Sequence, residues 1–136
     1  MLFRSQKLFN ISTRATAGTG DATLTAGIVV TGNASKRVMI RAVGPGLVPF
    51  GLTGTLPAPV LVLTNQSGQT VATASNWSAS ADAAAIAAAS AQSGAFPMVA
   101  GDAAMIVNLA PGAYTAQVTN AAGATGVALV EVYELP

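Results

Sequence analysis

Short segments in which apolar and polar residues alternate, separated by turn-forming residues, recur along the whole chain. Such alternation is typical of strands that bury one face, and Val, Ile and Thr, which favour strands, are frequent in these segments. The chain lacks the regular succession of strand and helix that builds a parallel sheet. The pattern therefore predicts an all-β fold, an antiparallel β-sandwich with jelly-roll or Greek-key connectivity and about eight strands. The predicted strands cover residues 7–15, 22–31, 36–43, 60–64, 69–75, 103–109, 113–120 and 126–135.

Two of the intervening turns predict hairpins. Residues 32–35 (Gly-Asn-Ala-Ser) join the strands at 22–31 and 36–43, and such a short turn between two strands is typical of a hairpin. A second hairpin is predicted around residues 65–68, where Gly68 supplies the position that needs a positive φ.

Residues 44–59 depart from the strand pattern. They contain four Pro and four Gly, which predicts a long loop without regular structure that either carries function or crosses between the sheets. Its apolar residues Leu47, Val48, Phe50 and Leu52 are expected to pack over the core.

Residues 79–92 are mostly Ala, the strongest helix former. This composition predicts one short Ala-rich helix within a loop. Ser80 is expected to cap it, with Asp82 in the first turn beside the positive end of the helix dipole.

The composition excludes several function classes. The 136 residues suffice for one domain and include neither Cys nor His, which excludes disulfides, zinc sites with sulfur or imidazole ligands, haem ligation and His-dependent catalysis. The six Lys and Arg residues are too few to neutralise a nucleic-acid backbone, so no nucleic-acid partner is expected. No apolar run reaches the roughly 20 residues of a spanning helix, so no membrane span is expected.

Only 8% of the residues are charged, and they are divided by sign along the chain. All six cations lie within the first 41 residues, whereas Asp82, Asp102, Glu131 and Glu134 follow. In one interpretation, these charges face one another inside one fold or are simply solvated. In the other, the basic end of one subunit meets the acidic end of the next in a head-to-tail assembly.

The titratable residues form no catalytic motif. No two of the five Asp and Glu residues have a spacing that fixes an acid–base geometry, so no catalytic residue, cofactor or metal site is predicted. Asp21 and Asp102 each adjoin a Gly, and turn capping is favoured over calcium binding for both.

Three aromatic residues are candidates for specific roles. Trp77, the single Trp, follows Asn76 in a polar loop. It either plugs one end of the sandwich with its N–H hydrogen-bonded or stacks on a sugar ring. Tyr114 is expected to anchor a strand edge with its hydroxyl satisfied. Tyr133 is expected in the core, with Glu131 on the same side of the strand.

Residues 1–9 are interpreted as an N-terminal arm and residues 10–136 as a single β-sandwich domain. The arm begins with three strongly apolar residues. It either forms an extra edge strand on its own sheet or adds to the open sheet edge of a neighbouring copy, which would build a filament. The proposed interface combines apolar residues of the arm, the 44–59 loop and the last strand: Met1, Leu2, Phe3, Leu8, Phe9, Leu47, Phe50, Leu52, Val132 and Leu135.

Seven short motifs, taken in their order along the chain, carry a resemblance to a known type of domain. They are residues 10–14 (NISTR), 18–21 (GTGD), 36–42 (KRVMIRA), 44–47 (GPGL), 76–77 (NW), 109–115 (LAPGAYT) and 126–133 (GVALVEVY). Over nearly its whole length the chain resembles a β-sandwich domain of secreted and cell-surface bacterial proteins, of the pre-peptidase C-terminal type. The resemblance implies export and a structural or adhesive accessory role, and it offers no catalytic residues. The Ala- and Ser-rich segment after Trp77 and the scarcity of acidic positions for calcium depart from this type of domain.

Together these features predict a non-catalytic structural subunit of an extracellular bacterial fibre or surface assembly. The subunit would self-associate through β-edge and apolar contacts, because its low charge leaves little like-sign repulsion between copies. The alternative is a carbohydrate-binding or adhesive module of a secreted protein, with Trp77 contacting the glycan. The resemblance favours an extracellular or cell-surface location, with the signal peptide not included in the sequence.

Overall fold

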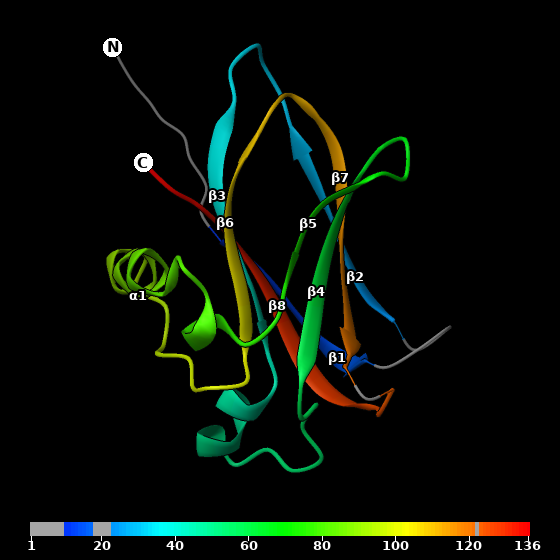
Figure 1. Ribbon diagram of the computed structural model, residues 1–136, viewed down its shortest axis with the longest axis vertical. Helices are drawn as coiled ribbons and strands as arrows, with labels where there is room; N and C mark the ends of the chain where they lie inside the picture. Colours follow the sequence, from blue (N-terminus) through cyan, green and yellow to red (C-terminus); the bar gives the residue numbers. More distant parts are fainter. Residues whose placement is uncertain (1–9, 18–22, 122) are drawn as a thin grey trace.

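The computed structural model describes residues 10–17, 23–121 and 123–136. Its strands are β1 (Asn10–Ala17), β2 (Leu24–Val30), β3 (Lys36–Val43), β4 (Pro59–Asn65), β5 (Thr70–Ala74), β6 (Ala103–Leu109), β7 (Gly112–Asn120) and β8 (Gly126–Glu134). They form two four-stranded antiparallel sheets that face each other (Figure 1). We call the sheet with strand order β1-β8-β3-β6 sheet A, and the sheet with order β2-β7-β4-β5 sheet B.

The strand pairing is that of one long hairpin rolled into two sheets. β1 pairs with β8, β2 with β7, β3 with β6 and β4 with β5, each antiparallel. Rolling adds the pairs β3–β8 and β4–β7, which complete the sheets. This is the strand order of an eight-stranded jelly roll. The predicted all-β antiparallel sandwich is therefore confirmed.

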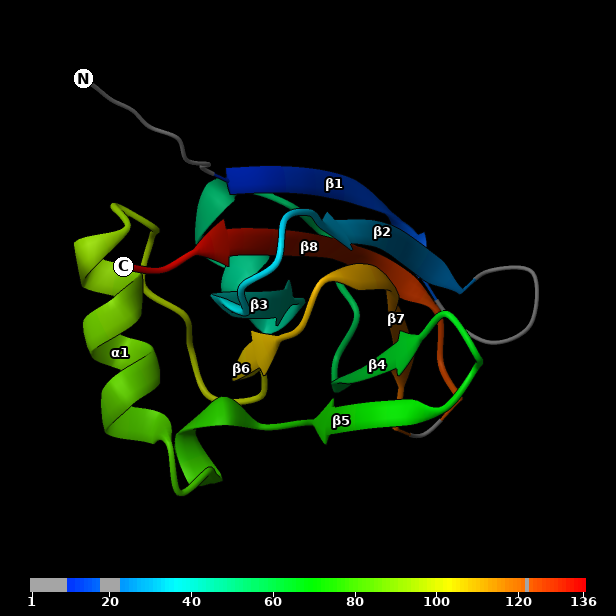
Figure 2. The ribbon, with the colours of Figure 1, turned by 90° about the horizontal axis from the view of Figure 1, so that it is seen from above.

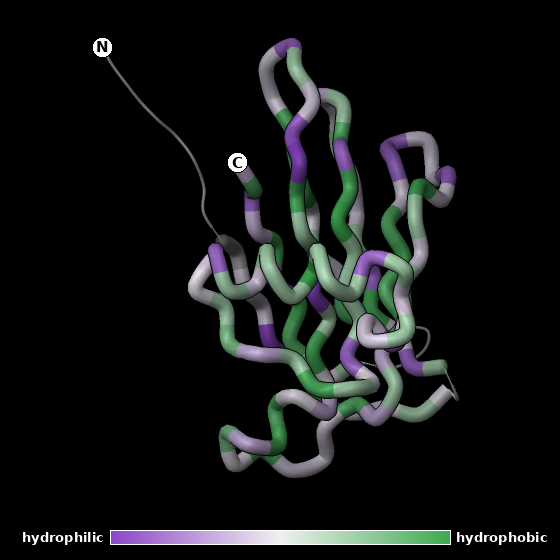
Figure 3. Tube along the Cα trace, turned by 60° about the vertical axis from the view of Figure 1, so that its left-hand side comes forward, coloured by the Kyte–Doolittle hydropathy of each residue, from purple (hydrophilic) through white to green (hydrophobic). Residues whose placement is uncertain are grey.

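The main hydrophobic core lies between the two sheets. Val38 and Ile40 of β3 point inward and belong to the same buried cluster as Leu61 and Leu63 of β4 and Val118 of β7. Removal of these side chains from water is the main force that holds the two sheets together. Figure 3 shows the same division along the chain, with hydrophobic residues along the strands and hydrophilic residues at several connecting turns.

The two inner strands of sheet A, β3 and β8, are largely buried on both faces. The helix α1 (Ala83–Gln92) lies beside this sheet, away from sheet B (Figure 2). Ile86 and Ala89 of α1 form a second buried cluster with Met39 of β3 and Tyr133 of β8. A strand covered on both faces loses the alternation of buried and exposed residues, which explains why six of the eight residues of β3 are buried.

The predicted hairpin between residues 22–31 and 36–43 is wrong. β2 belongs to sheet B and β3 to sheet A, so residues 31–35 cross from one sheet to the other. Alternation specifies which face of a strand is buried, and both strands do bury one face in the same core. It does not specify the neighbour, and here long-range pairing with β7, β6 and β8 prevails over local pairing.

The second predicted hairpin is confirmed. β4 pairs with β5 in sheet B. The Asn65 side-chain oxygen accepts hydrogen bonds from the N–H groups of Ser67 and Gln69, both at 3.0 Å, and Gly68 has a φ of 83°. The local turn chemistry was therefore sufficient to specify this hairpin.

The predicted helix begins later than expected. A short 3₁₀ turn, η3 (Trp77–Ala79), comes first, and α1 begins at Ala83. The Ser80 hydroxyl oxygen accepts a hydrogen bond from the Asp82 N–H at 3.0 Å. Ser80 thus shapes the turn before the helix, and Asp82 occupies the N-cap position.

The 44–59 segment crosses from sheet A to sheet B, as one of the two interpretations expected. It is not wholly irregular, because residues Pro45–Phe50 form a 3₁₀ helix, η2. The 3₁₀ geometry tolerates the two prolines because it needs few N–H donors, and the Leu47 N–H bonds the Gly44 carbonyl at 3.0 Å. Leu47 is buried, whereas Val48 and Phe50 are exposed.

Candidate functional site

The Asp102 carboxylate is fully buried where three segments of the chain meet. Oδ1 accepts hydrogen bonds from the N–H groups of Gly44 at 2.9 Å and Gly46 at 3.0 Å, and Oδ2 accepts one from the Val99 N–H at 3.0 Å. The Asp102 carbonyl accepts a hydrogen bond from the Trp77 N–H at 2.8 Å. We call these five residues the Asp102 knot. The carboxylate is fully occupied in holding the backbone together.

The Asp102 knot explains two of the sequence motifs. The GPGL motif contributes Gly44 and Gly46, and a Cβ at Gly46 would clash with Asp102 Oδ2, so this close approach requires glycine. In the NW motif, the side-chain oxygen of Asn76 accepts a hydrogen bond from the Gly101 N–H at 3.0 Å. Both motifs therefore serve the architecture.

The turn-capping role predicted for Asp102 is confirmed. The same prediction for Asp21 lies outside the described residues. In the part of the chain that the structure describes, no three carboxylates lie close enough together to hold a metal ion, and no helix is long and apolar enough to cross a membrane.

A charged network is buried between sheet A and α1. Arg41 Nε lies 2.9 Å from Glu131 Oε1, in an ion pair without hydrogen-bond alignment. Arg41 Nη1 donates hydrogen bonds to the Phe96 carbonyl at 2.8 Å and to Ser90 Oγ at 3.3 Å. The Tyr133 hydroxyl donates to Glu131 Oε2 at 2.9 Å. This network ties β3 and β8 to the helix and to the loop that follows it.

The division of charge along the sequence results from strand pairing inside one chain. β3 contributes Lys36 and Arg41, and its neighbour β8 contributes Glu134 and Glu131. Lys36 Nζ lies 3.3 Å from Glu134 Oε2, on a partly exposed surface. The interpretation that these charges face one another within the fold is confirmed for both pairs, so the division of charge does not argue for a head-to-tail assembly.

An apolar hollow of about 470 Å³ opens beside η2. Phe50 stands at its edge, 60% exposed, and contacts the ring of Phe96 edge-on with centroids 4.9 Å apart. The Arg41 guanidinium in turn lies over the Phe96 ring, 4.6 Å from its centroid, in a cation–π contact. We call this feature the η2 hollow; it is lined by Ser12, Arg14, Leu47, Phe50, Leu52, Phe96 and Leu129.

The η2 hollow brings together only part of the predicted interface. Leu47, Phe50 and Leu52 line it. Val132 points into the main core, and Leu135, directly after β8, belongs to the cluster under α1. Both are therefore buried within the domain, because this part of β8 is covered on both faces. The predicted arm residues lie outside the described residues: Met1, Leu2, Phe3, Leu8 and Phe9.

Sequence analysis did not select four residues of the η2 hollow: Ser12, Arg14, Phe96 and Leu129. Ser12 and Leu129 belong to ordinary alternating strands, and only the β1–β8 register brings them next to η2. Phe96 could have been selected from the sequence, since it is the one aromatic residue in an Ala-rich stretch and precedes a Pro.

The hydrogen bonds predicted for the Trp77 N–H and for the Tyr114 hydroxyl are present, but Trp77 lies beside η3 and α1 and not at an end of the sandwich. The Trp77 indole N–H donates to the Val99 carbonyl at 2.9 Å, so the ring plugs the junction of η3 with the 99–102 turn. The Tyr114 hydroxyl donates to the Ala110 carbonyl at 2.7 Å. Trp77 also lines a second hollow, of about 250 Å³, against α1.

Comparison with known proteins identifies the fold. No family model and no curated protein sequence matches the chain. Among solved structures, it is similar to the pre-peptidase C-terminal domain of a collagenase from Bacillus anthracis, with a TM-score of 0.54 over 90% of this chain and 88% of that one. The fold is a pre-peptidase C-terminal-like β-sandwich. At 15% identity, the likeness concerns the fold alone.

We predict that the Asp102 knot is essential for the stability of this pre-peptidase C-terminal-like sandwich. Asp102→Ala leaves the buried N–H groups of Gly44 and Gly46 and the partly buried N–H of Val99 without acceptors, each costing about 1–3 kcal/mol. The free energy of unfolding, measured by urea titration, should therefore fall by at least about 3 kcal/mol. Asp82→Ala, at an exposed N-cap carboxylate that makes no side-chain cap hydrogen bond, is the control and should lower it by no more than about 1 kcal/mol. Equal effects of the two substitutions would contradict the assignment.

We also predict an alkaline dependence of stability from Tyr133. Burial, aided by the negative charge of Glu131, raises the pKa of Tyr133 from 10.0 to about 12. Between these values the hydroxyl ionises in the unfolded chain but stays protonated in the folded one, so stability falls as pH rises through this range.

The loss from this one hydroxyl should reach about 2–3 kcal/mol. Urea titrations at a series of alkaline pH values should give a shallower decline for Tyr133→Phe than for the native sequence. Parallel declines would show that Tyr133 does not titrate in this way.

Proposed function

We propose that this domain is a non-catalytic accessory module of an exported bacterial protein and that it self-associates as part of a fibre or surface assembly. The fold is shared with a domain that belongs to a collagenase, which supports an accessory role. Asp102 and Glu131, the two buried carboxylates, are occupied by backbone N–H groups and by Arg41 and Tyr133. These contacts leave them unsuited to acid–base chemistry.

The observation that carries self-association is the exposed apolar surface of the η2 hollow. Phe50 is 60% and Val48 is 57% exposed on the same 3₁₀ helix. Exposed large apolar groups beside a concave apolar surface are typical of a contact site. An apolar side chain from another copy would fill the hollow and cover Phe50.

β1 makes the same surface suitable for strand addition. It is one of the two edge strands of sheet A as described, and Ser12 and Arg14 on it line the η2 hollow. An added strand would hydrogen-bond to the free edge of β1 while its side chains enter the hollow. We propose the apolar arm of a second copy, residues 1–9, as that strand, with Leu2 and Phe3 as its apolar anchors.

This proposal is tested by the mass of the particle in solution. The full chain should form oligomers by analytical ultracentrifugation. Phe50→Ser and the double substitution Leu2→Ser with Phe3→Ser should each shift it toward the monomer, because each removes one side of the contact. Val99→Ser removes an exposed apolar side chain elsewhere and should have no effect. Oligomers that survive both the Phe50 and the arm substitutions would overturn the proposal, as would a native chain that is monomeric at high concentration.

A carbohydrate-binding or adhesive module is the second candidate, because Trp77 lines the hollow beside α1. Of the other residues that line this hollow, only Ser90 carries a side-chain hydroxyl, whereas sugars need several hydrogen-bonding partners. Glycan-array binding that is lost in Trp77→Ala and retained in Trp77→Phe would establish this function. We expect no such binding, because the indole N–H is already committed to the Val99 carbonyl.

A further inference from the structure

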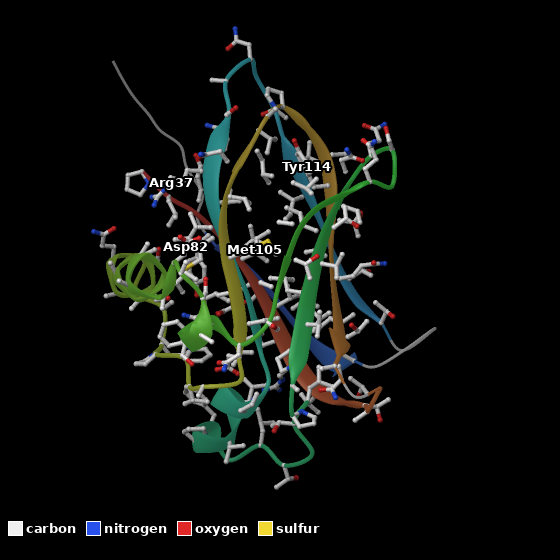
Figure 4. All side chains as sticks on the ribbon, viewed as in Figure 1. Arg37, Asp82, Met105 and Tyr114 are labelled. Atoms are coloured by element: carbon white, nitrogen blue, oxygen red, sulfur yellow. The ribbon has the colours of Figure 1, made fainter. Side chains whose placement is uncertain are left out.

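In the described strands, charged residues are confined to one of the two sheets. Among the described strands they occur on β1, β3 and β8, all of sheet A. The strands of sheet B, as described, contain none. Figure 4 shows the labelled Arg37 and Asp82 on the side of α1, away from sheet B. The outer face of sheet B is therefore a broad surface without charge.

Hydroxyl, amide and β-branched side chains cover this face. Thr25, Gln117, Val62 and Thr73 lie opposite one another in a row that crosses all four strands. Soluble monomeric domains usually present a mixture of Lys, Arg, Glu and Asp on such faces. The row here offers only short side chains and one amide, so it is flat as well as uncharged.

Two exposed apolar side chains stand at the edges of the same face. Val29 on β2 is 71% exposed and Val71 on β5 is 44% exposed. On the described surface they belong to a set of five exposed large apolar residues, two others of which are at η2. Four of the five thus lie on two separate elements: Phe50, which lines the η2 hollow, and Val48 lie on η2, whereas Val29 and Val71 lie on the outer face of sheet B.

The chemistry of this face favours a second copy as the partner. A nucleic acid or a strongly charged protein surface would require opposite charges on the face. A sugar would require an aromatic platform, and Tyr114, the aromatic residue of the sheet B strands, packs against the core. In a two-fold contact the residues near the axis meet their own copies, so a charge near the centre of the face would stand close to the same charge on the other copy. A face without charge meets itself with no such repulsion.

We propose that the outer face of sheet B packs against the same face of a second copy, in a two-fold contact distinct from the η2 hollow. Two sheets can pack face to face at about 10 Å, and Thr, Val and Gln side chains are short enough for that approach. The contact extends the proposed self-association but uses other residues, so an experiment can disprove either contact without disproving the other.

The size of the face sets the expected strength of the contact. Four strands about 4.8 Å apart and seven residues long cover an area of about 19 by 23 Å, or roughly 440 Å². Stable protein interfaces bury about 800 Å² on each partner. The contact should therefore be weak between free copies and become effective when copies are already held close together.

Cysteine cross-linking suits a weak contact, and the chain contains no natural Cys. Gln117→Cys lies on a central strand of the face, and Ala84→Cys lies on the exposed side of α1 as the control. Under mild oxidation at high protein concentration, Gln117→Cys should give several-fold more covalent dimer than Ala84→Cys. Equal yields from the two variants would overturn the proposal.

Two further substitutions separate this contact from the η2 hollow. Adding Phe50→Ser to both cysteine variants should leave the yield of Gln117→Cys several-fold above that of Ala84→Cys, even though fewer copies are then held together. Adding Thr115→Lys should reduce it to the level of the control, because it opposes like charges across the two-fold axis, whereas Thr115→Ser should preserve it. A difference between the two cysteine variants that disappears with Phe50→Ser, or a yield that Thr115→Lys does not change, would refute the sheet B contact while leaving the test of the η2 hollow intact.

Discussion

The hydrogen bonds to the Asp102 carboxylate position much of the surface of this domain. A carboxylate removed from water is costly unless donors surround it, and here three backbone N–H groups do so. Those on Gly44 and Gly46 fix the start of η2, and η2 presents Phe50. The third, on Val99, fixes the carbonyl that accepts the Trp77 indole N–H. One buried acid therefore helps to position Phe50, one residue of the predicted interface, and Trp77, the predicted glycan contact.

Burial of charge leaves the exterior poorer in charge than the composition alone implies. Arg41, Asp102 and Glu131 are buried, and Lys36 and Glu134 pair with each other. A buried ion pair adds little net stability, because desolvation offsets most of the attraction. The Arg41 network instead gives α1 a fixed position over sheet A, through Ser90 and the Phe96 carbonyl. The ring of Phe96, held over this cation, then forms one wall of the η2 hollow.

The sequence was sufficient to predict most elements but few of their neighbours. The strand at residues 103–109 and the β4–β5 hairpin follow from local alternation and from an Asn-to-Gly turn, and both are present as predicted. The β2–β3 hairpin was wrong, because alternation is the same whether two strands pair or face each other across a core. Asp102 could be identified as a cap, since it adjoins Gly101. Its partners, more than fifty residues away in sequence, could not be predicted without the fold.

The η2 hollow illustrates the same limit. Phe50 and Leu52 were recognisable as apolar residues in a Gly- and Pro-rich loop. Arg14 and Leu129 become their neighbours only because β1 and β8, the first and last strands, pair at the edge of sheet A. Sites assembled from both ends of a chain depend on long-range register, which single-sequence periodicity does not encode.

The rolled hairpin also determines what kind of assembly the two proposed surfaces can build. The η2 hollow and β1 lie on sheet A, whereas the uncharged face belongs to sheet B. A contact that joins an arm to a different surface is head-to-tail and propagates into an open chain of copies, whereas a face that meets itself closes after two copies. Because the two surfaces lie on opposite layers, use of one does not obstruct the other. A domain with both could pair its filaments laterally, and the weak sheet B contact would then be repeated along their length, where many small contacts add up.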